Sequence, residues 1–133
     1  MGAPDAMIWL IDGNNVFGSR PDGWWNDRPA AAARFTQRVA EWCRTHDDEV
    51  TIVFDAPVAA ATGLLAGGNL SVDEAARPGR DGADDRIVEL AGAAIERGAV
   101  DLTVVTSDRG LRQRLPATCA VIGAGRFREV IGY

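Results

Sequence analysis

The stretch Met7-Ile8-Trp9-Leu10-Ile11-Asp12 is a short apolar run that stops at an aspartate, and it sets the pattern for the fold. Two later apolar runs end in the same way, residues 50–54 at Asp55 and residues 102–107 at Asp108. Short apolar runs separated by helical patterns are typical of buried strands in a parallel sheet. The carboxyl ends of such strands meet at one edge, where open α/β sheets bind ligands. We therefore expect the three aspartates to lie together.

Neighbouring carboxylates repel one another unless a cation or a shared proton neutralises them. Each aspartate could instead cap the helix that follows its strand, and Asp108 in particular directly precedes a helical pattern. Capping explains one strand-terminal aspartate more easily than it explains three on strands expected to be adjacent. The pattern thus favours a metal site.

The composition of the chain fits one domain over residues 1–133. No apolar run is long enough to span a membrane, and the start has no features of a signal peptide. Two isolated cysteines, one histidine and no lysine exclude a structural zinc site, a Ser-His-Asp triad and a Walker phosphate loop. A net charge of −5 argues against a general nucleic-acid coating protein. The expected location is the reducing cytoplasm.

Helical patterns separate the apolar runs. Pro29 predicts the start of a helix that reaches about Thr45. Apolar residues spaced three and four apart from Ile87 to Ile95 predict a second helix over 83–97. The other expected elements are a turn-rich loop at 12–18, a surface loop at 21–27, an edge strand at 69–74, a helix at 108–115, a strand at 118–122 and a final short helix. This order predicts a three-layer α/β domain.

Asp84 and Asp85 begin the second helix, where the macrodipole favours acids. Helical spacing places Asp84 in one row with Val88, Ala91 and Ile95, which faces the core. A carboxylate on such a row needs a partner or a metal. We therefore expect Asp84 to hold a metal and Asp85, on a more exposed edge, either to support it or to cap the helix.

Other polar residues are expected around the aspartates. Asn14 and Asn15 could serve turn geometry, orient Asp12 or contact a phosphate. Ser107 could donate to a carboxylate or a phosphate, whereas strand packing better explains Thr106. Trp24 and Trp25 could stack on bases, but a hydrophobic lid explains them more simply. Five arginines between residues 109 and 133, opposed by one acid, predict a basic wall beside the acidic centre, and the candidates for holding flanking phosphates are Arg80, Arg86, Arg109 and Arg112.

Four motifs occur in order along the chain: Ile11-Asp12-Gly13-Asn14-Asn15-Val16, Val53-Phe54-Asp55, Gly82-Ala83-Asp84-Asp85-Arg86-Ile87 and Val105-Thr106-Ser107-Asp108-Arg109. Together they resemble the NYN-domain proteins of the PIN-like nuclease superfamily, especially the YacP-like branch. The resemblance implies a mainly parallel sheet ordered 3-2-1-4-5 and cleavage of RNA that depends on Mg²⁺ or Mn²⁺. The stretch between Asp55 and Ala83 matches the family poorly.

The resemblance also implies roles for individual residues. The four catalytic acids would be Asp12, Asp55, Asp84 and Asp108, of which Asp12, Asp84 and Asp108 would bind metal. Asn15 matches the asparagine of the family motif, and Asn15, Asp85 and Ser107 are expected to support these acids. Substrate-binding residues would be Asn14, Arg80, Arg86, Arg109 and Arg112. The number of metal ions stays open, since Gly82 stands where some related nucleases carry glutamate.

Several alternatives remain at this point. The same fold could serve as an inactive module that binds RNA or the ribosome, or as a toxin-type PIN nuclease. A haloacid-dehalogenase-like phosphatase is disfavoured, because its second aspartate is replaced by Asn14 and its lysine is absent. RNA is the expected partner and endonucleolytic cleavage the expected reaction. The RNA substrate and the oligomeric state, with a homodimer as one option, stay open.

Overall fold

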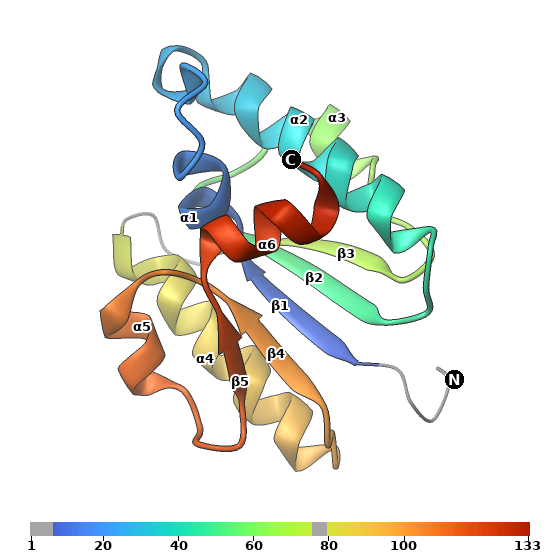
Figure 1. Ribbon diagram of the computed structural model, residues 1–133, viewed down its shortest axis with the longest axis vertical. Coiled ribbons are helices and arrows are strands. Elements are labelled where there is room, and N and C mark those ends of the chain that lie inside the picture. The colour runs from blue at the N-terminus through green and yellow to red at the C-terminus, as the bar shows by residue number, and fades with distance from the viewer. Residues whose placement is uncertain (1–6, 76–79) are drawn as a thin grey trace.

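The structure, a computed structural model, describes residues 7–75 and 80–133, except for the side chain of Arg80. Its centre is a five-stranded sheet in which all neighbouring strands are parallel (Figure 1). The strands are β1 (Ile8–Asp12), β2 (Glu49–Phe54), β3 (Leu70–Glu74), β4 (Leu102–Val105) and β5 (Ala120–Ile122). Their order is β3-β2-β1-β4-β5, which confirms the predicted fold class and strand order.

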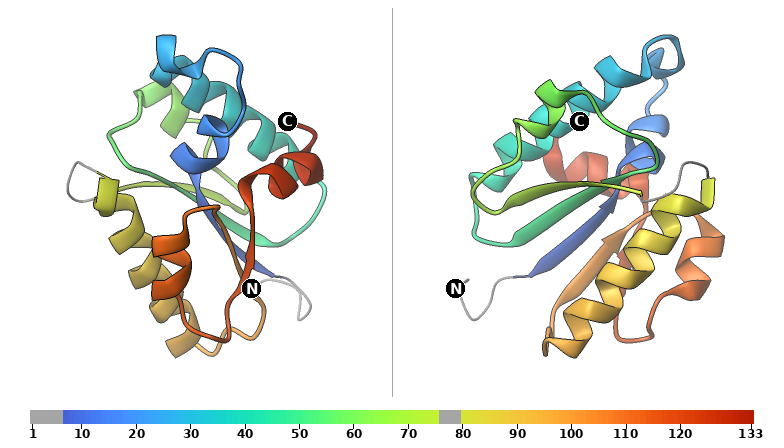
Figure 2. Two further views of the ribbon diagram at one scale, coloured as in Figure 1. Left: turned by 60° about the vertical axis from the view of Figure 1, so that its left-hand side comes forward. Right: turned by 180° about the vertical axis from the view of Figure 1, so that it is seen from behind.

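Helices cover both faces of the sheet, as the two views of Figure 2 show. One face carries α1 (Gly13–Gly18), α2 (Arg28–Cys43), α3 (Ala60–Gly63) and α6 (Ala124–Ile131). The other face carries α4 (Arg80–Glu96) and α5 (Arg109–Arg114). This three-layer arrangement follows from the sequence, because strands buried on both faces need apolar cover on each side.

Each face has its own apolar core. Phe35 and Val39 of α2, Phe127 of α6 and Ile52 of β2 are fully buried on the first face. On the second face, Ile87 of α4 packs in one cluster with apolar residues of β1, β2, β4 and α5. The two cores fix the strand ends relative to the helices that follow them, which is what positions the site.

The structure corrects the prediction of a loop at 12–18, because α1 begins directly after Asp12. Gly13 permits this tight connection: a Cβ atom there would lie 2.8 Å from a ring carbon of Phe54 and 2.9 Å from a methyl group of Ile52. The predicted surface loop contains a 3₁₀ turn, η1 (Trp24–Asn26), and α3 was not predicted. Among residues 7–75 and 80–133, no helix combines the length and apolar character needed to cross a bilayer.

Candidate active site

A polar pocket of about 270 Å³ lies at the carboxyl edge of the sheet. It is lined by Asp12, Asn14, Asn15, Phe17, Trp24, Arg28, Asp55, Ala83, Asp84 and Asp108. The four predicted acids thus come together from four places: the ends of β1 and β2, the start of α4 and the loop after β4. We call this hollow the acidic pocket.

Asp12 lies at the centre of the sheet, since β1 pairs with both β2 and β4. The residue is only 6% exposed, and the pKa of its carboxyl group is raised from 3.8 to about 7, chiefly by burial. The negative charges of Asp84 and Asp108 contribute to this rise, while hydrogen bonds from the Thr106 hydroxyl and the Asn15 backbone oppose it. At neutral pH, Asp12 therefore favours a cation or a proton beside it.

Thr106 connects two of the acids. Its hydroxyl donates to Oδ2 of Asp12 at 2.9 Å and accepts from the backbone N–H of Asp108 at 3.1 Å. The sequence favoured strand packing as the explanation for Thr106. Packing alone does not account for the hydrogen bond between its fully buried hydroxyl and Asp12. Thr106 therefore orients the Asp12 carboxylate and fixes the backbone that carries Asp108.

The Asp108 side chain has two roles. Its Oδ1 accepts from the backbone N–H of Leu111 at 3.0 Å, which caps the N-terminus of α5 as the alternative interpretation expected. The same side chain lines the acidic pocket. Capping thus holds Asp108 in place and does not remove it from the site.

Asp84 and Asp85 point in the directions expected from helical spacing. Asp84 is buried at 9% exposure, and burial together with the charge of Asp108 raises the pKa of its carboxyl group. Asp85 is half-exposed and accepts from Nη2 of Arg114 at 2.7 Å. The positive charge of Arg114 lowers the pKa of Asp84, so the arginine paired with Asp85 partly offsets the rise caused by burial and by Asp108.

Asparagine and serine side chains tie the strand-terminal loops to one another. Asn14 Oδ1 accepts from the backbone N–H of Asp55 at 2.9 Å, and Asn15 Oδ1 accepts from that of Ser107 at 2.8 Å. Ser107 Oγ in turn accepts from the N–H of Ala124 at the start of α6, at 2.8 Å. The two asparagines, both in α1, therefore join this helix to the segments after β2 and β4.

Asp55 lines the acidic pocket from the end of β2. Burial raises the pKa of its carboxyl group, and the positive charge of Arg28 partly offsets that rise. Sequence reasoning missed Arg28, which is exposed on the first turn of α2 and lies over the Trp24 ring, 5.3 Å from its centroid. Asp27 caps α2 through the N–H of Ala30, so the helix begins one residue before Pro29 and Arg28 faces the pocket.

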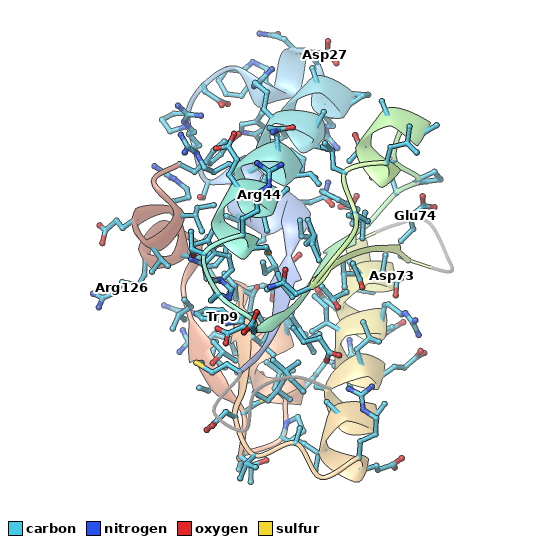
Figure 3. The ribbon with its side chains drawn as sticks, turned by 90° about the vertical axis from the view of Figure 1, so that its right-hand side faces the viewer. Trp9, Asp27, Arg44, Asp73, Glu74 and Arg126 are labelled. Carbon is cyan, nitrogen blue, oxygen red and sulfur yellow. The ribbon has the colours of Figure 1, made fainter. Side chains whose placement is uncertain are left out.

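The arginines predicted to hold phosphates do not line the acidic pocket, as far as their side chains are described. Arg86 binds Asp73 and Glu89 at 2.8 and 3.2 Å, beside the carboxyl end of β3, where Figure 3 labels Asp73 and Glu74. Arg109 and Arg112 are exposed on α5 and do not line the acidic pocket. Arg126 projects from α6 into solvent (Figure 3). Arg128 donates to the Ser19 carbonyl, and Arg80 begins α4 with its side chain outside the described part. Their roles in binding stay predictions.

Trp24 also contributes to the pocket wall. Its ring packs edge-on against Phe17, with 6.0 Å between centroids, whereas Trp25 is 59% exposed. The sequence led us to expect a hydrophobic lid that includes Trp24, and the structure places this ring at the acidic pocket. No sequence signal separated Arg28 from the other arginines, because its position depends on the chain path through η1.

The donor set suits a hard cation such as Mg²⁺ or Mn²⁺, which prefers carboxylate oxygens. Within residues 7–75 and 80–133, no three His, Cys, Asp or Glu side chains are arranged as a ready-made metal cage. Mg²⁺ does not require such a cage, since it usually keeps several waters and binds through one or two carboxylates and substrate phosphates. The buried Asp12, with Asp84 and Asp108 close enough to raise its pKa, fits this mode of binding.

Comparison with solved structures agrees with this architecture. The crystal structure of Rae1 (YacP) from Bacillus subtilis matches with a TM-score of 0.71 over 94% of this chain and 73% of that chain. The chain has a YacP-like fold. Sequence identity to Rae1 is 23%, so the likeness concerns the fold alone. No protein-family model and no curated protein matches the sequence.

Proposed function

We propose that the protein is a ribonuclease that hydrolyses internal RNA phosphodiester bonds at the acidic pocket with Mg²⁺ or Mn²⁺. The observation that carries this proposal is the convergence of Asp12, Asp55, Asp84 and Asp108 on one pocket at the carboxyl edge of the sheet. Four elements deliver these acids, and burial raises the pKa of three of them, Asp12, Asp55 and Asp84. Such perturbed groups gathered in a cleft are typical of functional sites.

Each acid has a role in this proposal. Asp12, Asp84 and Asp108 would hold the cation, and Asp55 would add negative charge to the pocket. When bound, a divalent cation lowers the pKa of water and neutralises charge that develops on the phosphodiester. Thr106 keeps the Asp12 carboxylate oriented through its 2.9 Å hydrogen bond. Asn15 and Ser107 would maintain the spacing of the loops.

RNA binding would combine the pocket with nearby cations. Arg28 is the arginine placed at the acidic pocket, and its guanidinium suits a phosphate oxygen. Asn14, Arg80, Arg109 and Arg112 remain proposed contacts to the flanking strand. Arg86, which is paired with Asp73 and Glu89, would join them only where RNA displaces these acids. The ribosome is one candidate source of the RNA, and the proposed location is the cytoplasm.

The test is incubation of a circular single-stranded RNA with the protein in Mg²⁺, Mn²⁺ or EDTA. A circle has no ends, so its conversion to a linear product identifies endonucleolytic cleavage. We expect cleavage with metal and none in EDTA, and a loss of at least about a hundredfold for Asp12→Asn and Asp108→Asn. Asp101→Asn is the matched control, because Asp101 is exposed and precedes β4 at the opposite edge of the sheet.

Equal cleavage by the parent and Asp12→Asn would overturn the proposal. If the parent binds RNA but does not cut it with either metal, the protein is the inactive binding module that shares this fold. Calorimetric titration with Mn²⁺ separates the cases further, since a functional pocket should bind the ion and Asp12→Asn should not.

A further inference from the structure

A second, smaller hollow adjoins the acidic pocket. It has a volume of about 150 Å³ and shares Asn14, Phe17, Arg28 and Asp55 with the acidic pocket. Its remaining walls come from the first turns of α2 (Pro29 and Ala32), from Phe54 at the end of β2 and from residues 56–59 after that strand. We call this hollow the side pocket.

The walls and volume of the side pocket limit what it can hold. Apart from Asn14, Arg28 and Asp55, the residues that line it are apolar, and Phe54 among them is fully buried. An apolar cavity of about 150 Å³ in another protein binds benzene, a single six-membered ring. A flat one-ring group therefore suits this space, whereas drug-sized ligands need pockets of roughly 300 Å³ or more.

The polar groups that line the side pocket suit the edge of a pyrimidine. Asn14 uses its Oδ1 for the N–H of Asp55, and its amide NH₂ has no hydrogen-bond partner within the described residues. The Asp55 carboxylate supplies an acceptor in the same wall. A pyrimidine edge presents both acceptors and a donor, which these two side chains can pair.

Arg28 lies where the two hollows meet. Its guanidinium makes no ion pair with any acid in the described part of the chain, although it is close enough to Asp55 to lower the pKa of that carboxyl group. An arginine in this position has donors left for a phosphate. A nucleotide could therefore place its phosphate at Arg28 and its base in the side pocket.

We propose that the side pocket binds one unpaired pyrimidine base of RNA, next to the phosphodiester held in the acidic pocket. The inference rests on the proposed function, because that function supplies the RNA strand. A base can enter the side pocket only after it leaves a stack or a pair, so the preferred substrate is single-stranded.

The test measures RNA binding by fluorescence anisotropy in Mg²⁺ with Asp12→Asn, which keeps the RNA intact. The ligands are an eight-residue oligouridylate, an oligoadenylate, a duplex and a base-free ribose-phosphate strand of equal length. We expect the oligouridylate to bind about tenfold tighter than the base-free strand, as loss of one base contact typically costs. Oligoadenylate and duplex should bind several-fold more weakly than oligouridylate.

Variants locate the base. Ala59→Trp, at an exposed position, would fill the side pocket and remove the preference for oligouridylate over the base-free strand. Ala61→Trp is the matched control: it adds the same side chain two residues later, where Ala61 lines a separate hollow beside α2. Arg28→Ala should weaken oligouridylate and the base-free strand by the same factor, because it removes a phosphate contact.

Equal binding of oligouridylate and the base-free strand would overturn the inference without any variant. Equal binding of oligoadenylate would overturn the assignment of a one-ring base, and an unchanged preference in Ala59→Trp would overturn its location. Cleavage by the parent is measured separately. If the parent cuts RNA while the base-free strand binds equally well, the inference alone fails; if base preference is seen without cleavage, the proposed function fails alone.

Discussion

Two aspartates at opposite edges of the sheet, Asp12 and Asp48, differ in how the fold satisfies their carboxylates. Asp48, just before β2, accepts from the backbone N–H of Met7 at 3.0 Å and from the indole N–H of Trp9 at 2.9 Å. Its Oδ2 also lies 3.6 Å from Nδ1 of His46. Asp12 has the Thr106 hydroxyl as its side-chain donor and two other acids nearby.

Asp48 stabilises the fold through its hydrogen bonds, whereas the buried charge of Asp12 destabilises it. Removing Asp48 leaves two donors without their acceptor, so the fold loses stability. Removing the charge of Asp12 relieves an unfavourable burial, so the fold gains stability. A buried carboxylate kept at such a cost is better explained by what it binds than by what it stabilises.

The largest expected effect is an opposite change in stability for the two aspartates. At pH 8 in EDTA, Asp12→Asn should raise the free energy of unfolding by about 2–4 kcal/mol, because the native state no longer buries a charge whose pKa is raised from 3.8 to about 7. Asp48→Ala should lower it by about 2 kcal/mol. Urea denaturation measures both, and a destabilised Asp12→Asn would contradict the comparison.

The pH dependence of stability sharpens the same contrast. The native state keeps the Asp12 proton up to about pH 7, whereas the unfolded chain releases it near 3.8. Between these values the native state binds more protons, so this residue makes stability fall as pH rises, by up to about 1.4 kcal/mol per pH unit. Above pH 7 the penalty is complete and flat.

Subtracting the Asp12→Asn curve from that of the parent isolates this contribution, because other acids titrate in both proteins. The measurement is the free energy of unfolding at several pH values from 4 to 8 in EDTA. A difference curve that is flat across this range would show that burial does not raise the Asp12 pKa.

The third effect concerns the hydroxyl that supports Asp12. Thr106→Val removes a hydrogen bond that lowers the Asp12 pKa, so this pKa should rise further and the acidic limb of the cleavage profile should move to higher pH. We expect cleavage at pH 7 to fall about tenfold, a typical effect of losing a group that orients a metal ligand. Thr106→Ser should restore the parent profile.

Thr103→Val is the matched control for Thr106→Val. Thr103 is also buried in this part of the chain, on β4, and makes no side-chain hydrogen bond within the described residues. Its substitution should leave the pH profile in place. A shift of equal size in both valine variants would point to packing of β4 rather than to the Asp12 contact.

Local patterns in the sequence predict much of this architecture. Each apolar run that stops at an aspartate contains a strand in the structure, because strand burial depends on a few consecutive residues, although β4 ends at Val105, two residues before the predicted end of the run. The inward position of Asp84 follows from helical spacing with Val88, Ala91 and Ile95, and Asp84 is buried as that row requires. The strand order came from the resemblance to a known family and not from any local pattern.

The features missed by sequence reasoning depend on contacts between distant segments. α1 was hidden because Gly13 and two asparagines are typical of turns, whereas the close approach of Gly13 to Phe54 is set by tertiary packing. Arg28 reaches the pocket only because Asp27 caps α2 and η1 turns the chain. The basic wall was predicted from the number of arginines near the C-terminus. That number does not tell where their side chains point.

The smallest expected effect applies the same comparison to arginines. Arg86 is held by Asp73 and Glu89, whereas Arg109 and Arg112 make no ion pair within the described residues. Arg109→Ala and Arg112→Ala should each weaken RNA binding about twofold to threefold. If each contacts one phosphate, the slope of the logarithm of the binding constant against the logarithm of the salt concentration should become shallower by about 0.7. Arg86→Ala should leave that slope unchanged, because its donors already serve two acids. Titrations at several salt concentrations decide this. A surface ion pair is worth at most about 1 kcal/mol, which is weak enough for RNA to displace Asp73 and Glu89. A reduced slope for Arg86→Ala would show that RNA does so.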